Sequence, residues 1–386
     1  MITLDQPVSD RSSDNPFANM NFTRPDISTQ LGLNDIISTL KKAETDSKVK
    51  GIFLELTDVP SGQATIEEIR NALIDFRKSG KFIVSYSETF TQKSYYLASV
   101  SDKIYMNPAG AMEFKGMVGQ VMFFKGLLDK IDVEAQVIRH GKFKSAVEPF
   151  TLDKMSEPSK VQTLTFISGM WKHMLEGISS SRKIPVEDLN AIANEYKIQS
   201  PQNAVSLKMV DKLLYKDEVL DELKNRVGAK KIKDIKLMKL GKYAKAPGED
   251  KKSSDNKIAV IYASGNIISG EGDEESIGSE GISKAIRKAR LDENVKAIVA
   301  FSPGEYFEPE YKLKTILTNY PKPLFVGCTA LEFTYFSDIE GFPGTDNVLF
   351  KPTSGEGMHG TRALLRENLS RDEYWLSLLI FFKSLQ

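Results

Sequence analysis

A chain of 386 residues is too long for one ordinary hydrophobic core, so we expect two or three domains. Its 52 Lys and Arg residues balance 52 Asp and Glu residues, and this zero net charge gives no indication of a nucleic-acid partner. The single cysteine, Cys328, and three histidines exclude a disulfide framework and a multi-thiolate metal site, and leave little material for histidine-based catalysis. We expect no cofactor and no metal.

The amino-terminal segment MITLDQPVSDRSSDNPF carries neither a basic nor an apolar run, so we expect no signal peptide in it. From residue 32, helix and strand patterns alternate. GLNDIISTLKKAETDSKVKGIFLEL, residues 32–56, predicts an amphipathic helix, a charged turn and an apolar strand. Thr65 and Glu68 indicate a capping box that opens the next helix, and further strands are predicted at 82–86 and 103–106. This alternation predicts an α/β fold with mostly parallel strands.

After Phe150 the pattern becomes helical. Ser156 is predicted to cap a long helix that runs through Ile178, and residues 184–196 form another helical pattern, so we expect a helical arm outside the α/β core. The lysine-rich stretch 230–252 closes in the polar segment APGEDKKSSDN, which is typical of an exposed linker. We interpret its lysines as solvated, with attraction to an anionic bilayer as the alternative. The expected domains are residues 1–228 and 257–386, joined by a linker at 229–256.

The second half repeats the first. Residues 281–301, GISKAIRKARLDENVKAIVAF, follow the same helix, turn and strand order as residues 32–56, and residues 322–355 pair loosely with residues 81–110. The repeat is far longer than the unit of a solenoid, so we expect an internal duplication of a domain-sized unit. Near the end of the sequence, the apolar run 374–382 is about half the length that a membrane-spanning helix needs, and we interpret it as a core helix or the cut edge of a fold rather than an interfacial anchor.

Familiar catalytic motifs, such as a phosphate-binding loop or a nucleophile elbow, are absent. Cys328 and His359 lack an orienting carboxylate at a telling spacing, and we interpret Cys328 as a buried side chain. The segment RHGKFKSAVEPF, residues 139–150, places Lys142 and Lys144 beside small residues after a strand-like run. A lysine that is desolvated in such a place can be neutral near pH 7 and act as a general base, although a lone lysine in a loop is usually solvated.

Three runs in the first half carry a family resemblance: YYLASVSDKIYMNP, FKGLLDKIDVEAQV and, above all, KSAVEPF. Through them, residues 33–228 resemble the amino-terminal half of the signal peptide peptidase A (protease IV) family in its long, duplicated bacterial form. Residues 258–299 look like the start of that family's second half, and the resemblance fades after Val299 into a truncated, divergent remainder.

The resemblance implies two crotonase-like, Clp-protease-like ββα units and a Ser-Lys dyad that cleaves hydrophobic peptides such as released signal peptides. Lys144, rather than Lys142, matches the family's general base, and it would project into a cleft between the domains. The family further implies a homo-oligomer on the outer (periplasmic) face of the cell membrane. Membrane contact would then pass through an anchor missing from this chain or through a surface patch.

The second half departs from the family's pattern. Its oxyanion turn reads FSPGEYF, in which Gly304 is retained but Glu305 replaces a glycine, and a carboxylate there opposes a developing oxyanion. The glycine-rich nucleophile turn is also replaced by bulky residues. Counting back from Lys351 places Ser337 at the nucleophile position, and counting forward from the strand at 322–326 places Thr334 there.

These departures predict a largely disarmed peptidase site. The corresponding place in the first half holds Gln92 and Lys93. A non-catalytic, peptide-binding or assembly relative of the family is therefore the alternative function. A crotonase-type acyl-CoA enzyme is a further alternative, but KSAVEPF argues against it.

Overall fold

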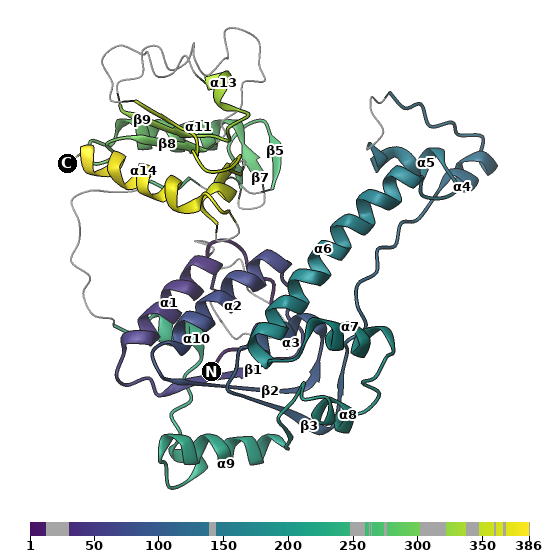
Figure 1. Ribbon diagram of the computed structural model, residues 1–386, viewed down its shortest axis with the longest axis vertical. Coiled ribbons are helices and arrows are strands. Elements are labelled where there is room, and N and C mark those ends of the chain that lie inside the picture. The colour runs from purple at the N-terminus through teal and green to yellow at the C-terminus, as the bar shows by residue number, and fades with distance from the viewer. Residues whose placement is uncertain are drawn as a thin grey trace. The chain divides into compact units, whose positions relative to one another are not determined.

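The computed structural model describes residues 1–12, 31–138, 144–247, 259–261, 263, 265–273, 276–301, 322–336, 347–358, 360–365 and 368–385. The chain divides into two compact units, Met1–Glu249 and Asp250–Gln386. Each is described by itself below, with its elements labelled as in Figure 1.

Unit 1, Met1–Glu249, is built on a four-stranded parallel sheet in the order β1-β2-β3-β4. Apolar side chains of these strands are buried on both faces, which is the usual condition of a parallel sheet. This arrangement confirms the predicted α/β class. The four strands are β1 (Gly51–Glu55), β2 (Phe82–Phe90), β3 (Lys103–Met112) and β4 (Lys212–Leu213).

Two groups of helices bury the two faces of this sheet. The larger apolar cluster joins one face to α1 (Leu33–Thr45), α2 (Gln63–Arg77) and α3 (Gln92–Ala98). The smaller cluster packs Phe53, Val84 and Tyr105 against Val219 and Leu223 of α9 (Lys216–Val227). Both faces of the sheet are therefore covered by helices.

The capping box predicted from Thr65 and Glu68 is wrong. α2 begins at Gln63, and its N-cap is Gly62, which has extended backbone and no side chain to accept a hydrogen bond. The amide of Ile66 already donates to the carbonyl of Gly62 at 3.1 Å. Because the helical hydrogen bonds start there, Thr65 lies inside the first turn and is not the residue before it.

The long predicted helix is present as α6 (Glu157–Arg182), and its N-cap is Ser156, as expected: the Ser156 hydroxyl accepts from the amide of Ser159 at 3.3 Å. Its carboxyl-terminal half buries Met174, Leu175 and Ile178 against the core. Figure 1 shows α6 passing beside α3, with its amino-terminal end near α4 (Lys125–Lys130) and α5 (Glu148–Thr151).

A glycine allows α6 and α3 to approach closely. A Cβ added at Gly177 would lie 2.7 Å from the ring of Tyr96, which is closer than real Cβ atoms come to their neighbours. After α6, the chain forms α7 (Val186–Asn194) and α8 (Pro201–Ser206), and it then enters β4.

Part of the stretch interpreted as a linker packs against unit 1. It forms the short helices η2 (Ile232–Asp234) and α10 (Leu240–Ala244). The Tyr243 hydroxyl donates to the Asp46 carboxylate at 2.8 Å, and the amide of Leu240 donates to the carbonyl of Met1 at 3.0 Å. These bonds hold residues 240–243 beside the end of α1.

Unit 2, Asp250–Gln386, has a parallel sheet in the order β10-β9-β8, formed by β8 (Ile298–Phe301), β9 (Leu324–Gly327) and β10 (Val348–Phe350). A second small sheet contains β5 (Asn266–Ile268), β6 (Gly272–Asp273) and β7 (Ser276–Gly278). The helices are α11 (Ser279–Leu291), α13 (Phe333–Phe336) and α14 (Arg371–Ser384), with the 3₁₀ turn η5 (Gly360–Leu364).

The apolar run 374–382 lies in α14, which buries Tyr374, Leu378 and Phe381. Its other large apolar side chains are exposed, so the interpretation as a core helix stays a prediction; they are Trp375, Leu376, Leu379, Ile380 and Phe382. Leu378 and Phe381 of this helix pack against Phe325 of β9. In the part of the chain that the structure describes, no helix combines the length and the apolar character needed to cross a bilayer.

A charged turn joins α1 to β1 in unit 1. The Asp46 carbonyl accepts from the amide of Val49 at 3.0 Å, and its carboxylate accepts from the amide of Lys48 at 2.9 Å. The Lys81 ammonium, which precedes β2, donates to the same Asp46 carbonyl at 2.7 Å. This lysine therefore ties the end of α1 to the start of the neighbouring strand.

The turn between α11 and β8 in unit 2 has the same bonds. The Asp292 carbonyl accepts from the amide of Val295 at 3.0 Å, and its carboxylate accepts from the amide of Asn294 at 2.9 Å. The Lys322 ammonium, which precedes β9, donates to the Asp292 carbonyl at 3.0 Å.

The strand pairing agrees as well. Ile52 pairs with Ile83 in unit 1, and Ile298 pairs with Leu324 in unit 2. Each second-strand residue lies two positions after the lysine of its turn. Its amide donates to a side-chain oxygen just before the third strand, that of Asp102 at 2.8 Å and that of Asn347 at 3.0 Å.

Candidate functional site

The predicted base, Lys144, lies in unit 1, directly before a short 3₁₀ turn, η1 (Ser145–Val147), that leads into α5. Its side chain is exposed. The competing lysine, Lys142, falls at 139–143, outside the described residues. The choice between the two lysines stays a prediction.

A buried carboxylate lies at the end of the KSAVEPF motif. The side chain of Glu148 is 2% exposed, and it accepts from the Ser156 hydroxyl at 2.6 Å and from the Ser156 amide at 3.1 Å. Ser156 caps α6, so the motif is bonded to the first turn of the long helix. Glu148 was given no role in the sequence analysis.

Aromatic packing holds the other side of this motif. Phe150 stacks on Phe124, with ring centroids 6.0 Å apart and planes 24° apart. The amide of Phe124 also donates to the carbonyl of Pro149 at 2.7 Å. The segment that follows Lys144 thus contacts both the start of α6 and the residue before α4.

In unit 2, the described candidate residue is Thr334, the second residue of α13, with an exposed side chain. Reciprocal hydrogen bonds between Thr329 and Glu332 precede this helix, since each side chain accepts from the other residue's amide, at 3.2 and 3.0 Å. They form a capping box that sets the start of the turn. Ser337, Gly304 and Glu305 lie outside the described residues.

The corresponding place in unit 1 is filled by structural contacts. Gln92, the first residue of α3, accepts from the amides of Lys115 and Gly116 at 2.6 and 2.8 Å and donates to the Gly116 carbonyl at 2.9 Å. The Lys93 ammonium donates to the Ser61 carbonyl at 3.0 Å. Both side chains anchor neighbouring loops.

Cys328 is buried, as interpreted from the sequence. Its thiol lies 3.5 Å from the carbonyl of Phe350, and burial raises its pKa to about 11. A thiol with such a pKa is protonated at neutral pH and is a poor nucleophile. His359 lies outside the described residues.

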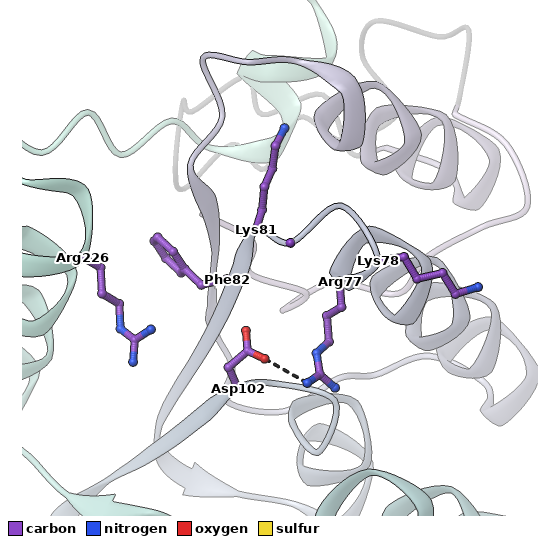
Figure 2. Close-up of a pocket in the computed structure, with 7 residues that line it drawn as sticks. Arg77, Lys78, Lys81, Phe82, Asp102 and Arg226 are labelled. Carbon is purple, nitrogen blue, oxygen red and sulfur yellow. Dashed lines mark ion pairs between the residues drawn. The ribbon is translucent and has the colours of Figure 1, made fainter.

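An open pocket in unit 1 has several cationic residues on its walls (Figure 2). Arg77 pairs with Asp102 at 2.9 Å, and Lys81 donates to two backbone carbonyls, which leaves these charges engaged within the protein. The Arg226 guanidinium lies 5.6 Å from the centre of the Phe82 ring. We interpret the pocket as part of the scaffold. Its lining consists of Arg77, Lys78, Gly80, Lys81, Phe82, Asp102 and Arg226.

A buried cation that sequence reasoning missed joins three helices. Arg70 of α2 is 4% exposed and donates to the Gly177 carbonyl and the Ser181 hydroxyl of α6 at 2.5 and 2.6 Å. Its guanidinium lies 4.7 Å from the centre of the Tyr96 ring in α3. The hydroxyl of Tyr96 donates to the Glu67 carboxylate. This cluster fixes the buried end of α6.

No group of three or more His, Cys, Asp or Glu side chains among the described residues could hold a metal ion.

Residues 75–230 match the model of peptidase family S49, and this span contains the KSAVEPF motif. The chain is similar to Protease 4 of Haemophilus influenzae, with 31% identity over 286 residues that cover 70% of this chain and 46% of the relative. It is similarly related to Protease 4 of Salmonella typhi, with 32% identity over 288 residues that cover 70% of this chain and 45% of the relative.

A plant relative, the chloroplastic serine protease SPPA of Arabidopsis thaliana, is 29% identical over 287 residues, which cover 71% of this chain and 42% of the relative. The fold and these matches define a protein with a peptidase S49 domain. These matches support a protein of the signal peptide peptidase A (protease IV) type, as the resemblance of its first half indicated. It spans less than half the length of these three relatives.

Proposed function

We propose that the chain is an S49 peptidase that cleaves hydrophobic peptides, such as released signal peptides, with a hydroxyl nucleophile and Lys144 as general base. The observation that carries this proposal is the S49 match over residues 75–230, which includes KSAVEPF. The names of the relatives, two of them Protease 4 and one a serine protease, support a peptidase rather than a non-catalytic binding protein.

In the proposed reaction, the neutral amine of Lys144 takes the proton of the nucleophilic hydroxyl while the oxygen of that hydroxyl attacks the peptide carbonyl. The lysine then returns this proton to the leaving amine, and water hydrolyses the acyl-enzyme ester. A lysine amine must be out of water to be neutral near pH 7. The side chain of Lys144 is exposed in unit 1, so the proposal requires that bound peptide desolvates it.

We further propose that the two units arose by duplication of one crotonase-like unit. The matching turns at Asp46 and Asp292, the matching lysines and the equal strand registers support this origin.

The same alignment supports Thr334, and not Ser337, as the nucleophile. α3 begins at Gln92, 11 residues after Lys81, and α13 begins at Phe333, also 11 residues after Lys322. The two units therefore have the same number of residues between this lysine and the start of the following helix. In this alignment Thr334 corresponds to Lys93. The extra residues of the second half then fall after Thr334.

We propose slow catalysis, because Glu305 replaces a glycine of the oxyanion turn in the sequence. Gly304 is the proposed oxyanion donor. A homo-oligomer and a place on the outer face of the cell membrane are proposed from the family alone.

The experiment is cleavage of an internally quenched hydrophobic peptide by the full chain. Lys144→Ala and Lys144→Arg should each lower kcat/KM by about 100-fold or more, because general-base catalysis contributes about that much. Lys154→Ala, which removes another exposed lysine nearby, is the matched control and should cleave normally. Peptide binding without any cleavage would instead support the non-catalytic alternative.

A further inference from the structure

A carboxylate is almost never fully buried unless its oxygens are bonded, because removing it from water is costly. Glu148 is buried in this way although it belongs to a short turn far from the sheet, on which the rest of the unit 1 core is built. We infer that Glu148 is a positioning residue, which fixes the turn that carries Lys144 onto the first turn of α6. The inference rests on the proposed role of Lys144.

Two hydrogen bonds of Glu148 connect the KSAVEPF motif to the first turn of α6. One oxygen accepts from the Ser156 hydroxyl at 2.6 Å, and the other accepts from the Ser156 amide at 3.1 Å. The same hydroxyl accepts from the amide of Ser159 and so completes the cap of α6. The negative charge also lies at the amino-terminal end of a 26-residue helix, where the helix dipole favours it.

From Glu148 the constraint reaches Lys144 through a single turn. The amide of Glu148 donates to the carbonyl of Ser145, and its carbonyl accepts from the amide of Leu152 at 2.9 Å. Residues 145–147 form one 3₁₀ turn, so a short, hydrogen-bonded stretch of backbone connects Lys144 to Glu148. Loss of the carboxylate contacts should therefore free the backbone on which the amine is mounted.

A second contact distinguishes this role from general stability. The carbonyl of Pro149 and the ring of Phe150 hold the motif against Phe124, independently of the bonds to Ser156. Without the Glu148 contacts, the motif would still be attached there but free to pivot. We expect local loosening rather than unfolding of unit 1.

The test compares Glu148→Gln and Ser156→Ala with Glu157→Gln in the full chain. Glutamine keeps one acceptor but turns an amide NH₂ toward the donors of Ser156, and Ser156→Ala removes the hydroxyl. Glu157→Gln is the matched control, since Glu157 is the next residue of α6, is exposed and pairs only on the surface with Lys160. Ser156→Thr restores the hydroxyl.

Two readouts are measured. Amide hydrogen exchange across residues 145–151 should accelerate by about 10- to 100-fold in Glu148→Gln and Ser156→Ala, with no change across Met174–Ile178. The value of kcat for peptide cleavage should fall by about 10-fold with KM unchanged, because a displaced base affects the chemical step more than substrate binding. Ser156→Thr and Glu157→Gln should behave like the parent chain.

The two readouts separate this inference from the function on which it rests. If the chain cleaves peptides and Glu148→Gln alters neither exchange at 145–151 nor kcat, the positioning role is rejected and the function stands. If the chain cleaves nothing but the exchange changes as expected, the proposed function is rejected and the anchoring is supported. Equal acceleration at 145–151 and at 174–178 would mean that Glu148 acts on global stability, and it would overturn the inference.

Discussion

Replacing Arg70 with methionine would remove a buried guanidinium while keeping most of the apolar stem. The guanidinium donates to the Gly177 carbonyl, the Ser181 hydroxyl and the Tyr96 carbonyl, at 2.5, 2.6 and 3.3 Å. Hydrogen bonds from a charged donor contribute about 1.5–3 kcal/mol each, and relief of the cost of burying the charge offsets part of this sum. We expect a net loss of about 2–4 kcal/mol in the free energy of unfolding.

The assay is urea unfolding followed by tryptophan fluorescence. The chain has two tryptophans, and Trp375→Phe leaves Trp171, a partly buried residue of α6, as the reporter of unit 1. Arg77→Met is the control, because Arg77 is 40% exposed in its pair with Asp102, and we expect it to cost at most about 1 kcal/mol. If Arg70→Met costs no more than Arg77→Met, the burial of the guanidinium cancels its hydrogen bonds and our reasoning about α6 is wrong.

Three further predictions concern unit 2. Hydrogen bonds from Ser354 and Thr353 lower the pKa of Glu373 to about 2, so their stabilising effect should be present above pH 4.5 and disappear as the pH falls toward 2. The protection of the amides at 353–354, measured relative to their intrinsic exchange rates at each pH, should fall in that window, and Glu373→Gln should remove this pH dependence of the protection. Because burial raises the pKa of the Cys328 thiol to about 11, a thiol reagent at pH 8 should label it only after urea unfolding; rapid labelling of the native chain would contradict the buried site. Thr334→Ala should abolish labelling by a fluorophosphonate probe, Thr334→Ser should increase it several-fold by relieving the hindrance of the methyl group, and Ser337→Ala should leave it unchanged; loss of labelling in Ser337→Ala would reverse the assignment.

Local periodicity predicted the elements that position the candidate site. Neighbouring residues encode α6, which Ser156 caps, and β1, which follows the turn at Asp46. Both elements can therefore be predicted from a single sequence. The start of α2 could not be read in this way. A glycine without a capping side chain opens that helix, and Thr65 offered a stronger but misleading signal.

Long-range contacts account for most of what the sequence did not reveal. Arg70 donates a hydrogen bond to Gly177, which is 107 positions away. A local sequence pattern cannot indicate that a distant helix buries this cation. Glu148 is only eight positions from Ser156, but its burial depends on the fold of the intervening turn. The proposal of Thr334 as the nucleophile likewise uses the strand register as well as the count from Lys322.

The long helix α6 is packed into the core near its carboxyl-terminal end, so a small tilt there moves its amino-terminal end by a larger distance. α6 is about 39 Å long at 1.5 Å per residue, and the apolar side chains that it buries, Met174, Leu175 and Ile178, lie in its carboxyl-terminal half. A tilt of about 5° around those contacts moves the Ser156 end by about 2.5 Å, which is several times the width of the roughly 2.6–3.2 Å range over which a proton is transferred directly. Under the proposed role of Lys144 as base, a ligand that bent α6 would therefore displace the amine through Ser156 and Glu148, and would change the rate of cleavage without entering the site.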